Sequence, residues 1–218
     1  MPQILKNDFF ARDSLEVAKS LIGKVLCHKC DGVWLKAMII ETEAYYGDEP
    51  ESHASKGRTK SKEALYMEPG TIYMYYSRGN DSIGFSTLGD GSSVLIKSGI
   101  PFVEESEGSK MLSKMHELNP INGRMREDHL LCSGQSIICK SLGLKVKDWN
   151  KKNIGGDNLH IEDVGYAPES LVACERLGMS KKRHYQLLHR VFDAKYQESI
   201  TKDPRTKNSK EGLDYEYL

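Results

Sequence analysis

Apolar and polar residues alternate at helical spacing near the start of the chain. After Asp13 and Ser14, apolar positions recur every three or four residues as far as Ile22, and Gly23 then ends the pattern. Asp and Ser are favoured at helix N-termini because their side chains accept hydrogen bonds from unpaired backbone N–H groups. The pattern therefore predicts a helix that begins near residue 14.

Strand patterns follow this helix. Residues 24–46 predict a β-hairpin that turns at Asp31-Gly32, because this dipeptide readily adopts the left-handed backbone that a two-residue turn requires. Further runs are rich in β-branched and aromatic residues, which favour strands. They predict strands at 71–76, 83–87, 94–98 and 159–161.

The remaining sequence indicates how the chain is organised. Ser133 is expected to cap a short helix, and no internal repeat or linker interrupts the chain. Residues 1–197 are therefore predicted to form a single α+β (mixed α/β) domain, a largely antiparallel β-sheet flanked by helices. Residues 198–218 are polar and charged, and we expect a C-terminal tail that frays or lies over the surface.

Composition excludes some classes of protein. Hydrophobic residues make up 39% and charged residues 28% of the 218 residues, which is typical of a soluble globular protein. No run of 18 apolar residues exists, so no membrane span is expected. The first residues lack the apolar stretch of an export signal, which predicts a cytoplasmic protein, nucleoid-associated if the source is bacterial.

The cysteines leave two interpretations. Cys27 and Cys30 form a C-x-x-C pair, while Cys132, Cys139 and Cys174 are scattered. One interpretation is a zinc site built from the first four of these residues, but the second pair has the loose spacing that structural zinc sites rarely show. We therefore expect reduced thiols and no metal.

Charge is balanced overall but unevenly distributed. Lys and Arg number 31, as do Asp and Glu, yet the runs 53–62 and 176–190 contain basic residues and no acid. Either run alone is typical of a solvated surface, whereas the two together favour a one-sided positive face suited to nucleic acid. The candidate DNA contacts in these runs are Lys56, Arg58, Lys181, Lys182 and Arg183.

The segment from Ile39 to Tyr46 contains the most informative polar residues. Side chains alternate across a strand, so Ile39, Glu41, Glu43 and Tyr45 are predicted to share one face. One interpretation is a solvated strand end. The other is a carboxylate at the rim of an aromatic pocket, where it can take a proton from an attacking water.

Tyrosines are dense around this segment, at positions 45, 46, 66, 73, 75 and 76. Tyr73 and Tyr75 are predicted to share a face of one strand. Tyrosines on strands commonly pack a core, but their flat rings also suit a planar ligand such as a nucleobase, where stacking contributes about 1–3 kcal/mol per base.

Together these residues resemble the alkyladenine (3-methyladenine, or methylpurine) DNA glycosylase family. The similar motifs keep the family order from about Phe9 to Phe192. They are the runs 40–45, 57–59 with His53, 69–75 with Met67, 89–91, 94–97, 131–134 and 176–178. The resemblance implies a mixed α/β domain with a curved antiparallel sheet, no metal and no cofactor.

The resemblance also implies a role for each matching residue. Glu43 would be the general base that activates water, while Tyr45 and Tyr75 would sandwich a flipped-out base and His53 would hydrogen-bond near it. Lys97 stands where the family usually has Arg, which contacts the water and the phosphate of the flipped nucleotide. The backbone carbonyl of Leu177 would help to hold the water.

Three positions depart from the family pattern. The family's intercalating Tyr has no direct counterpart, and Arg78 is the candidate wedge. Gly84 falls where a pocket Asn is common, which predicts a wider or less selective pocket. Gln135 replaces a Pro.

The sequence thus predicts a monofunctional DNA glycosylase that acts in base excision repair on alkylated or deaminated purines of the 3-methyladenine type. Its partner would be double-stranded DNA containing damaged purines, and a monomer is expected. One alternative is a glycosylase with lyase activity through Lys97, which the nearby Glu41 and Glu43 disfavour because they stabilise the ammonium form. Another is a catalytically weakened protein that binds damaged DNA.

Overall fold

The structure, a computed structural model, describes residues 2–104, 107–121, 123–178 and 187–218. Its strands are β1 (Gln3–Ile4), β2 (Val25–Cys30), β3 (Val33–Tyr45), β4 (Ile72–Ser77), β5 (Asn80–Ser86), β6 (Ser93–Pro101), β7 (Leu159–Asp163), β8 (Leu171–Cys174), β9 (Arg190–Asp193) and β10 (Tyr215–Tyr217). Its α-helices are α1 (Asn7–Phe10), α2 (Ser14–Leu21), α3 (Gly108–Leu118), α4 (Gln135–Ser141) and α5 (Val146–Trp149). Its 3-10 helices are η1 (His53–Lys56), η2 (Lys60–Tyr66), η3 (Asp128–Leu130) and η4 (Ala194–Tyr196).

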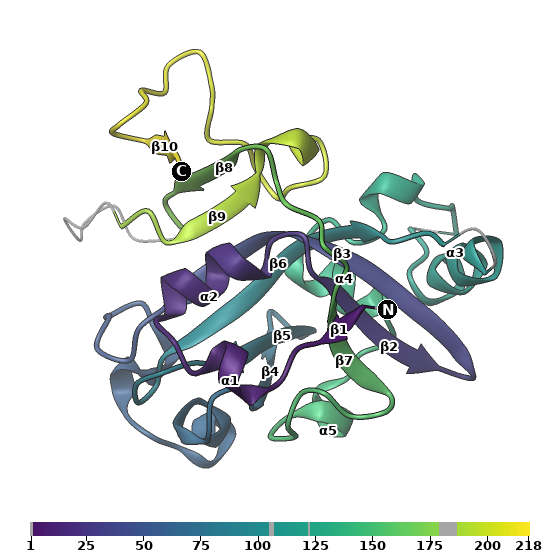
Figure 1. Cartoon of the computed structure of the whole chain (residues 1–218), viewed down its shortest axis with the longest axis horizontal. Coiled ribbons are helices and arrows are strands. Elements are labelled where there is room, and N and C mark those ends of the chain that lie inside the picture. Colours follow the sequence, from purple (N-terminus) through teal and green to yellow (C-terminus); the bar gives the residue numbers. More distant parts are fainter. Residues whose placement is uncertain (1, 105–106, 122, 179–186) are drawn as a thin grey trace.

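The strands form one antiparallel sheet in the order β1-β7-β2-β3-β6-β5-β4, with β9, β8 and β10 branching from β3 (Figure 1). The long strand β3 is central: its second half pairs with both β6 and β9. The predicted α+β class, with a single domain and a largely antiparallel sheet, is confirmed.

Most of the predicted elements are present. Asp13 caps α2 by accepting hydrogen bonds from the backbone N–H groups of Leu15 and Glu16. The β2–β3 hairpin turns at Asp31 and Gly32, whose φ angles of 49° and 79° are the left-handed values that the turn requires.

Some elements were predicted incorrectly or not at all. Ser133 does not cap α4: the residue at the N-cap is Gly134, which has a φ of 113° and contributes no side-chain cap. Helix α3 and strands β8, β9 and β10 were not anticipated, because their sequences are short or largely polar.

Among the described residues, three apolar clusters hold the sheet to its neighbours. The larger of the two main clusters joins α2, α3 and α4 to strands β3, β4, β5 and β6, and the smaller joins β2 and β3 to β8, β9 and the segment around Ile200. The third joins η1 and η2 to β4. None of the described helices is long and apolar enough to cross a membrane.

A bulge in β3 changes which side chains share a face. The register against β6 shifts on both sides of Glu41. Before the shift Ala37 and Ile39 pack in the larger cluster, whereas after it Ala44 does so. The prediction that Ile39 shares a face with the two glutamates is therefore wrong, because an extra residue in a strand reverses the alternation.

The C-terminal residues return to the sheet. Strand β10 pairs with β8, with Tyr215 opposite Cys174, and the backbone N–H of Thr201 donates to Glu41 Oε2 over 2.8 Å. The segment therefore packs over the domain and shields part of β3. The division between a domain ending at residue 197 and a tail stays a prediction.

Candidate active site

A cavity of about 360 Å³ opens beside the second half of β3. Its walls come from β3, β4, β5 and β6, from the loop before η1 and from the segment after β8. The lining residues are Tyr45, Pro50, Glu51, Ser52, His53, Leu65, Tyr73, Tyr75, Gly84, Ser93, Val94, Leu95, Leu177 and Gly178. All five predicted pocket residues (Tyr45, His53, Tyr75, Gly84 and Leu177) are thus brought together.

Glu43 adjoins this cavity through two of its lining residues. Its side chain has no solvent-accessible surface. Oε2 accepts a hydrogen bond from the Tyr45 hydroxyl over 2.7 Å, and Oε1 accepts one from the backbone N–H of Leu177 over 3.3 Å. The interpretation of this segment as a solvated strand end is therefore wrong. The carboxylate contacts Tyr45 and Leu177, which both line the cavity, and its position at the rim of an aromatic pocket stays a prediction.

The contact made by Leu177 differs in kind from the expected one. The resemblance implied that its backbone carbonyl helps to hold a water, whereas the contact seen is its N–H on Glu43 Oε1. A hydrogen bond to a carboxylate oxygen fixes the orientation of the side chain. The role of the carbonyl stays a prediction.

Lys97 lies beside the carboxylate and is 8% exposed. Its ammonium nitrogen is 3.3 Å from Glu43 Oε1 and donates to Gln135 Oε1 over 3.0 Å. The Gln135 amide in turn donates to the hydroxyl of Ser82 over 3.2 Å. Gln135, which replaces a proline of the family pattern, therefore positions the ammonium group.

The opposite wall of the site is aromatic. The rings of Tyr73 and Tyr75 stack at a centroid distance of 5.2 Å, and the His53 ring meets Tyr75 edge-on at 4.5 Å. His53 Nδ1 lies 3.0 Å from the Tyr73 hydroxyl. Burial raises the pKa of Tyr73 to about 12, while burial and the charge of Lys62 lower the pKa of His53. The wall is therefore uncharged near pH 7.

A buried cation supports the other side of Tyr45. The guanidinium carbon of Arg176 is 4.4 Å from the Tyr45 ring centroid, and Arg176 also hydrogen-bonds to Ala44 O and Glu49. Burial by itself raises the pKa of Glu49, but hydrogen bonds from His189 and Arg176 outweigh it and the net shift is downward. This ion-paired cluster fixes the ring that separates it from the cavity.

Gly84 is required by close backbone packing. A Cβ atom at this position would lie 2.5 Å from the carbonyl oxygen of Val94 on β6. Since real Cβ atoms do not approach a backbone oxygen so closely, any larger residue must push β5 away from β6. The cavity wall here is bare backbone.

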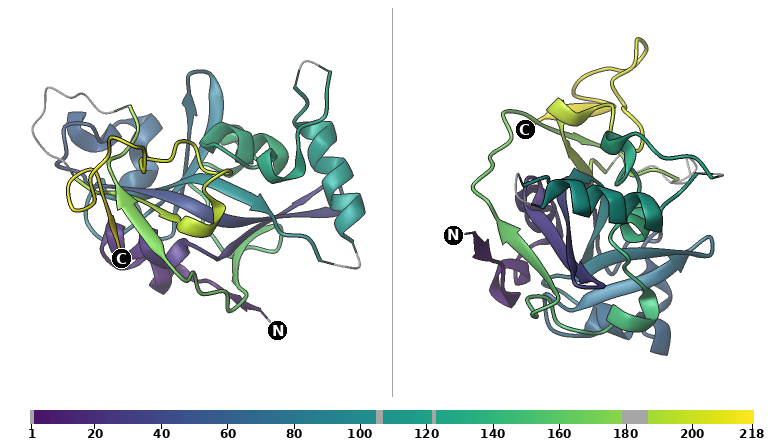
Figure 2. Two further views of the ribbon diagram at one scale, coloured as in Figure 1. Left: turned by 90° about the horizontal axis from the view of Figure 1, so that it is seen from above. Right: turned by 90° about the vertical axis from the view of Figure 1, so that its right-hand side faces the viewer.

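The predicted DNA contacts that the structure describes, Lys56, Arg58 and Arg78, do not line the cavity. Arg78 occupies the tip of the β4–β5 hairpin with a φ of 51°, and Figure 2 (left) shows this hairpin projecting from the same side as the segment that carries η1 and η2. In that segment Lys56 is exposed, and Arg58 pairs with Glu63 over 3.3 Å. Lys181, Lys182 and Arg183 lie outside the described residues.

The two arginines at the ends of the second basic run do not contribute to the positive face that the sequence predicted. Arg176 and Arg190, at its two ends, are 5% and 1% exposed and pair with Glu49 and Glu41. Both face the interior, because buried carboxylates need a cationic partner. The run therefore supplies fewer groups to a positive face than its composition indicated.

Several lining residues were not selected from the sequence. Tyr73 could have been selected, since it shares a strand face with Tyr75. Arg176, which supports Tyr45 from outside the cavity, lies in the motif 176–178, but its pairing with Glu49 could not be predicted because the two residues are far apart in sequence. Among the described residues, one group of side chains could donate to a metal ion. Of the four cysteines in the zinc interpretation, it contains only Cys27.

The chain is similar to known proteins over its whole length. A family model described as methylpurine-DNA glycosylase matches residues 8–196. A protein of Pseudomonas syringae pv. tomato, named "Putative 3-methyladenine DNA glycosylase", is 44% identical over 219 residues, which cover 100% of this chain and 98% of the relative. Relatives with the same name are 45% identical in Pseudomonas fluorescens (98% of this chain, 93% of the relative) and 35% identical in Clostridium botulinum (80% and 87%).

Proposed function

This chain belongs to the methylpurine-DNA glycosylase family, and from that premise we propose that it excises 3-methyladenine and related alkylated or deaminated purines from double-stranded DNA. As a DNA glycosylase it hydrolyses an N-glycosyl bond, the step that releases a damaged base during DNA repair. The observation that carries the finer proposal is a buried carboxylate, Glu43, adjoining a cavity walled by tyrosines.

The cavity suits a base that has left the duplex. The reacting C1′ atom is inaccessible in stacked DNA, so the nucleotide must be extruded at a cost of a few kcal/mol. Stacking on Tyr45 and Tyr75 offsets part of this cost, at about 1–3 kcal/mol per base. A positively charged purine gains further from the electron-rich ring faces. Both rings line the cavity, which supports their assignment as the base-binding walls.

Glu43 acts as the general base in this proposal. Its carboxylate takes a proton from water as the water oxygen bonds to C1′, and the electron pair of the C1′–N bond leaves with the base. The same negative charge stabilises the positive charge that develops on the sugar. Leu177 and Lys97 contact Oε1, whereas Oε2 accepts one hydrogen bond, from Tyr45, and so can accept a second one from a water.

Lys97 stabilises charge rather than forming a covalent bond with the sugar. A lyase needs a nitrogen that is free to attack the sugar, whereas the Lys97 nitrogen pairs with the Glu43 carboxylate 3.3 Å away. A hydrogen bond to Gln135 also engages the nitrogen. We therefore favour a monofunctional enzyme over the lyase alternative, with the Lys97 charge close to where a flipped nucleotide would enter.

The DNA backbone would lie across the face that carries Lys56, Arg58 and the β4–β5 hairpin. In this proposal Arg78 at the hairpin tip enters the duplex where the nucleotide leaves, and Lys181, Lys182 and Arg183 add phosphate contacts. Such contacts weaken as salt rises, because binding releases counterions. We propose that the chain acts on DNA as a monomer, as the family resemblance implies.

The experiment is incubation of the purified chain with methylated duplex DNA, followed by chromatography of the released bases. Free 3-methyladenine and an intact abasic strand are expected. A covalent adduct trapped by borohydride would favour the lyase alternative. Tight binding to damaged DNA with no base released would favour the catalytically weakened binding protein, and would overturn the proposal.

A further inference from the structure

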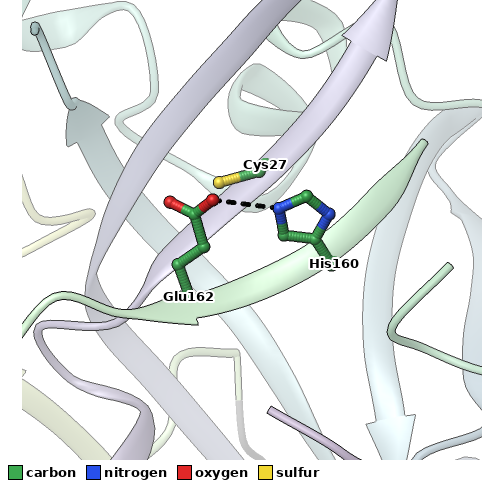
Figure 3. A group of neighbouring side chains, drawn as sticks. All are labelled: Cys27, His160 and Glu162. Carbon is green, nitrogen blue, oxygen red and sulfur yellow. Dashed lines mark hydrogen bonds and ion pairs between the residues drawn. The ribbon is translucent and has the colours of Figure 1, made fainter. Parts of the chain in front are cut away.

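A second cluster of chemically active side chains lies on strands β2 and β7, and none of its members lines the cavity. Cys27 and His160 are direct cross-strand partners, and Glu162 is two residues further along the same strand as His160. Figure 3 shows the three side chains pointing toward one another. One donor atom from each lies within 4.8 Å of the others.

The cluster is largely shielded from solvent. Cys27 has no accessible surface and His160 is 7% exposed. His160 Nε2 lies 3.1 Å from Glu162 Oε1, so these two groups already meet head to head. The Trp34 ring packs against the imidazole at a centroid distance of 5.0 Å and restricts its rotation. The donors are therefore held by two strands of the central sheet, which position side chains more firmly than loops do.

We propose that Cys27, His160 and Glu162 bind a divalent transition metal ion of the zinc class. Thiolate, imidazole and carboxylate are the three ligand types that zinc takes from proteins, and three of them leave a fourth position for water. One thiolate and one carboxylate also neutralise the double charge of the ion. No metal was expected from the sequence, because only the spacing of the cysteines was compared with that of zinc sites.

Lys36 is the competitor for this site. Its ammonium nitrogen lies 3.3 Å from Glu162 Oε2 and 2.9 Å from Glu104 Oε2. Lys36 supplies the positive charge that compensates Glu162. When a metal ion binds Glu162, Lys36 can stay paired with Glu104, so neither the lysine nor the carboxylate is left without an oppositely charged partner.

Cobalt titration tests the proposal on the full-length chain after removal of metals with a chelator. Co²⁺ is the probe because a thiolate ligand gives it an intense charge-transfer absorption that carboxylates alone do not give. One equivalent per chain is expected, with the band lost when Zn²⁺ displaces the cobalt. Cys27→Ser should remove the band and weaken binding at least ~100-fold, since losing an outer-shell partner alone costs 10–100-fold.

Cys30→Ser is the matched control, because it removes the other thiol of the same C-x-x-C pair on the same strand and should leave the titration unchanged. Lys36→Met should tighten cobalt binding by about tenfold, as one competing positive charge is removed. If Cys27→Ser fails to fold, as judged by circular dichroism, His160→Gln replaces it and should lower affinity and shift the visible absorption.

An absence of any thiolate band in the parent chain would overturn the site and leave a buried network of ion pairs and hydrogen bonds. So would a band that survives Cys27→Ser in folded protein. Neither result bears on base release, which uses other residues and is measured separately on methylated DNA.

Discussion

Glu41 and Glu43 lie two residues apart on β3, and neither has any accessible surface, yet their surroundings differ in kind. Glu41 accepts four hydrogen bonds: from Ser98 Oγ, from both the backbone N–H and the hydroxyl of Thr201, and from Arg190. Glu43 is held by Tyr45, Leu177 and Lys97 beside an open cavity.

The difference indicates that burial alone does not identify a reactive carboxylate. A buried charge needs compensation, and Glu41 receives it from a fully buried arginine and from the C-terminal segment, which leave no room for a reactant. Glu43 is compensated by Lys97 and contacts Tyr45 and Leu177, which both line the cavity. The bulge at Glu41 re-aligns β3 so that the second carboxylate meets the tyrosines rather than the apolar core.

The largest effect is expected from Glu43→Gln. The amide cannot take a proton from water, so the single-turnover rate of base release from methylated DNA should fall by about 10²–10⁴-fold. Binding to abasic DNA, followed by fluorescence anisotropy, should stay within about twofold because no phosphate contact changes. Base release at the parent rate would remove Glu43 from the mechanism.

Glu41→Ala should instead unfold the protein more easily. It leaves the buried Arg190 without its carboxylate, which typically costs about 3–5 kcal/mol. Urea unfolding measures this loss as a lower midpoint. The matched control is Glu63→Ala, which removes exposed ion pairs with Arg58 and Lys151 and should lower the midpoint far less, because exposed ion pairs contribute little to stability. An equal cost for the two variants would show that Glu41 is not the structural carboxylate.

Tyr75→Ala tests whether the aromatic wall distinguishes the Glu43 region from the Glu41 region. The variant should weaken binding to lesion-containing DNA by about 1–3 kcal/mol, beyond any effect on undamaged DNA, because a stacked base loses its platform. Tyr215→Ala, on β10 and away from the cavity, is the control. Equal weakening on both DNAs would show that Tyr75 does not stack on an extruded base.

Gln135→Ala tests how Lys97 is positioned, a feature that the Glu41 region lacks. The variant loses the hydrogen bond between Gln135 and Lys97, which contributes about 0.5–1.5 kcal/mol. The rate of base release should therefore fall by between about twofold and tenfold, while DNA binding is retained. Ser82→Ala removes only the far end of the chain of hydrogen bonds and should have a smaller effect. A Gln135→Ala rate equal to that of the parent would mean that Lys97 is held without the amide.

The smallest effect is a pH dependence at the aromatic wall. Burial and the charge of Lys62 lower the pKa of His53 below its ordinary value of 6.5. As pH falls below 6.5, the unfolded chain gains a proton before the folded one, so the free energy of unfolding decreases. In His53→Gln, the urea midpoint should therefore change less between about pH 7 and pH 5 than it does in the parent. Some change should remain, because burial also lowers the pKa of His28. An unchanged slope would contradict the assignment.

Local patterns in the sequence predicted much of the fold. The Asp13 cap, the Asp31-Gly32 turn and the strands around Tyr73 and Phe85 follow from propensities that act over a few residues. The bulge in β3 could not be predicted, because it depends on how β6 pairs with β3 across some 55 residues of sequence.

The candidate site shows the same limit. Glu43, Tyr45 and Tyr75 were found because they lie in short runs that resemble a family. The environment of each carboxylate could not be predicted, because Arg190 and Thr201, which contact Glu41, lie about 150 residues away in sequence. Gly84 was identified as a departure from the family, but its cause, the carbonyl of Val94, is a contact between strands.

The most direct test of the account compares Glu41→Gln with Glu43→Gln in one single-turnover assay on methylated duplex DNA, with each rate divided by the folded fraction of that variant. The account predicts that Glu41→Gln releases base within about threefold of the parent, while Glu43→Gln is slower by about 100-fold or more. Equal losses in the two variants, or a greater loss at Glu41, would contradict the division of roles between the two carboxylates.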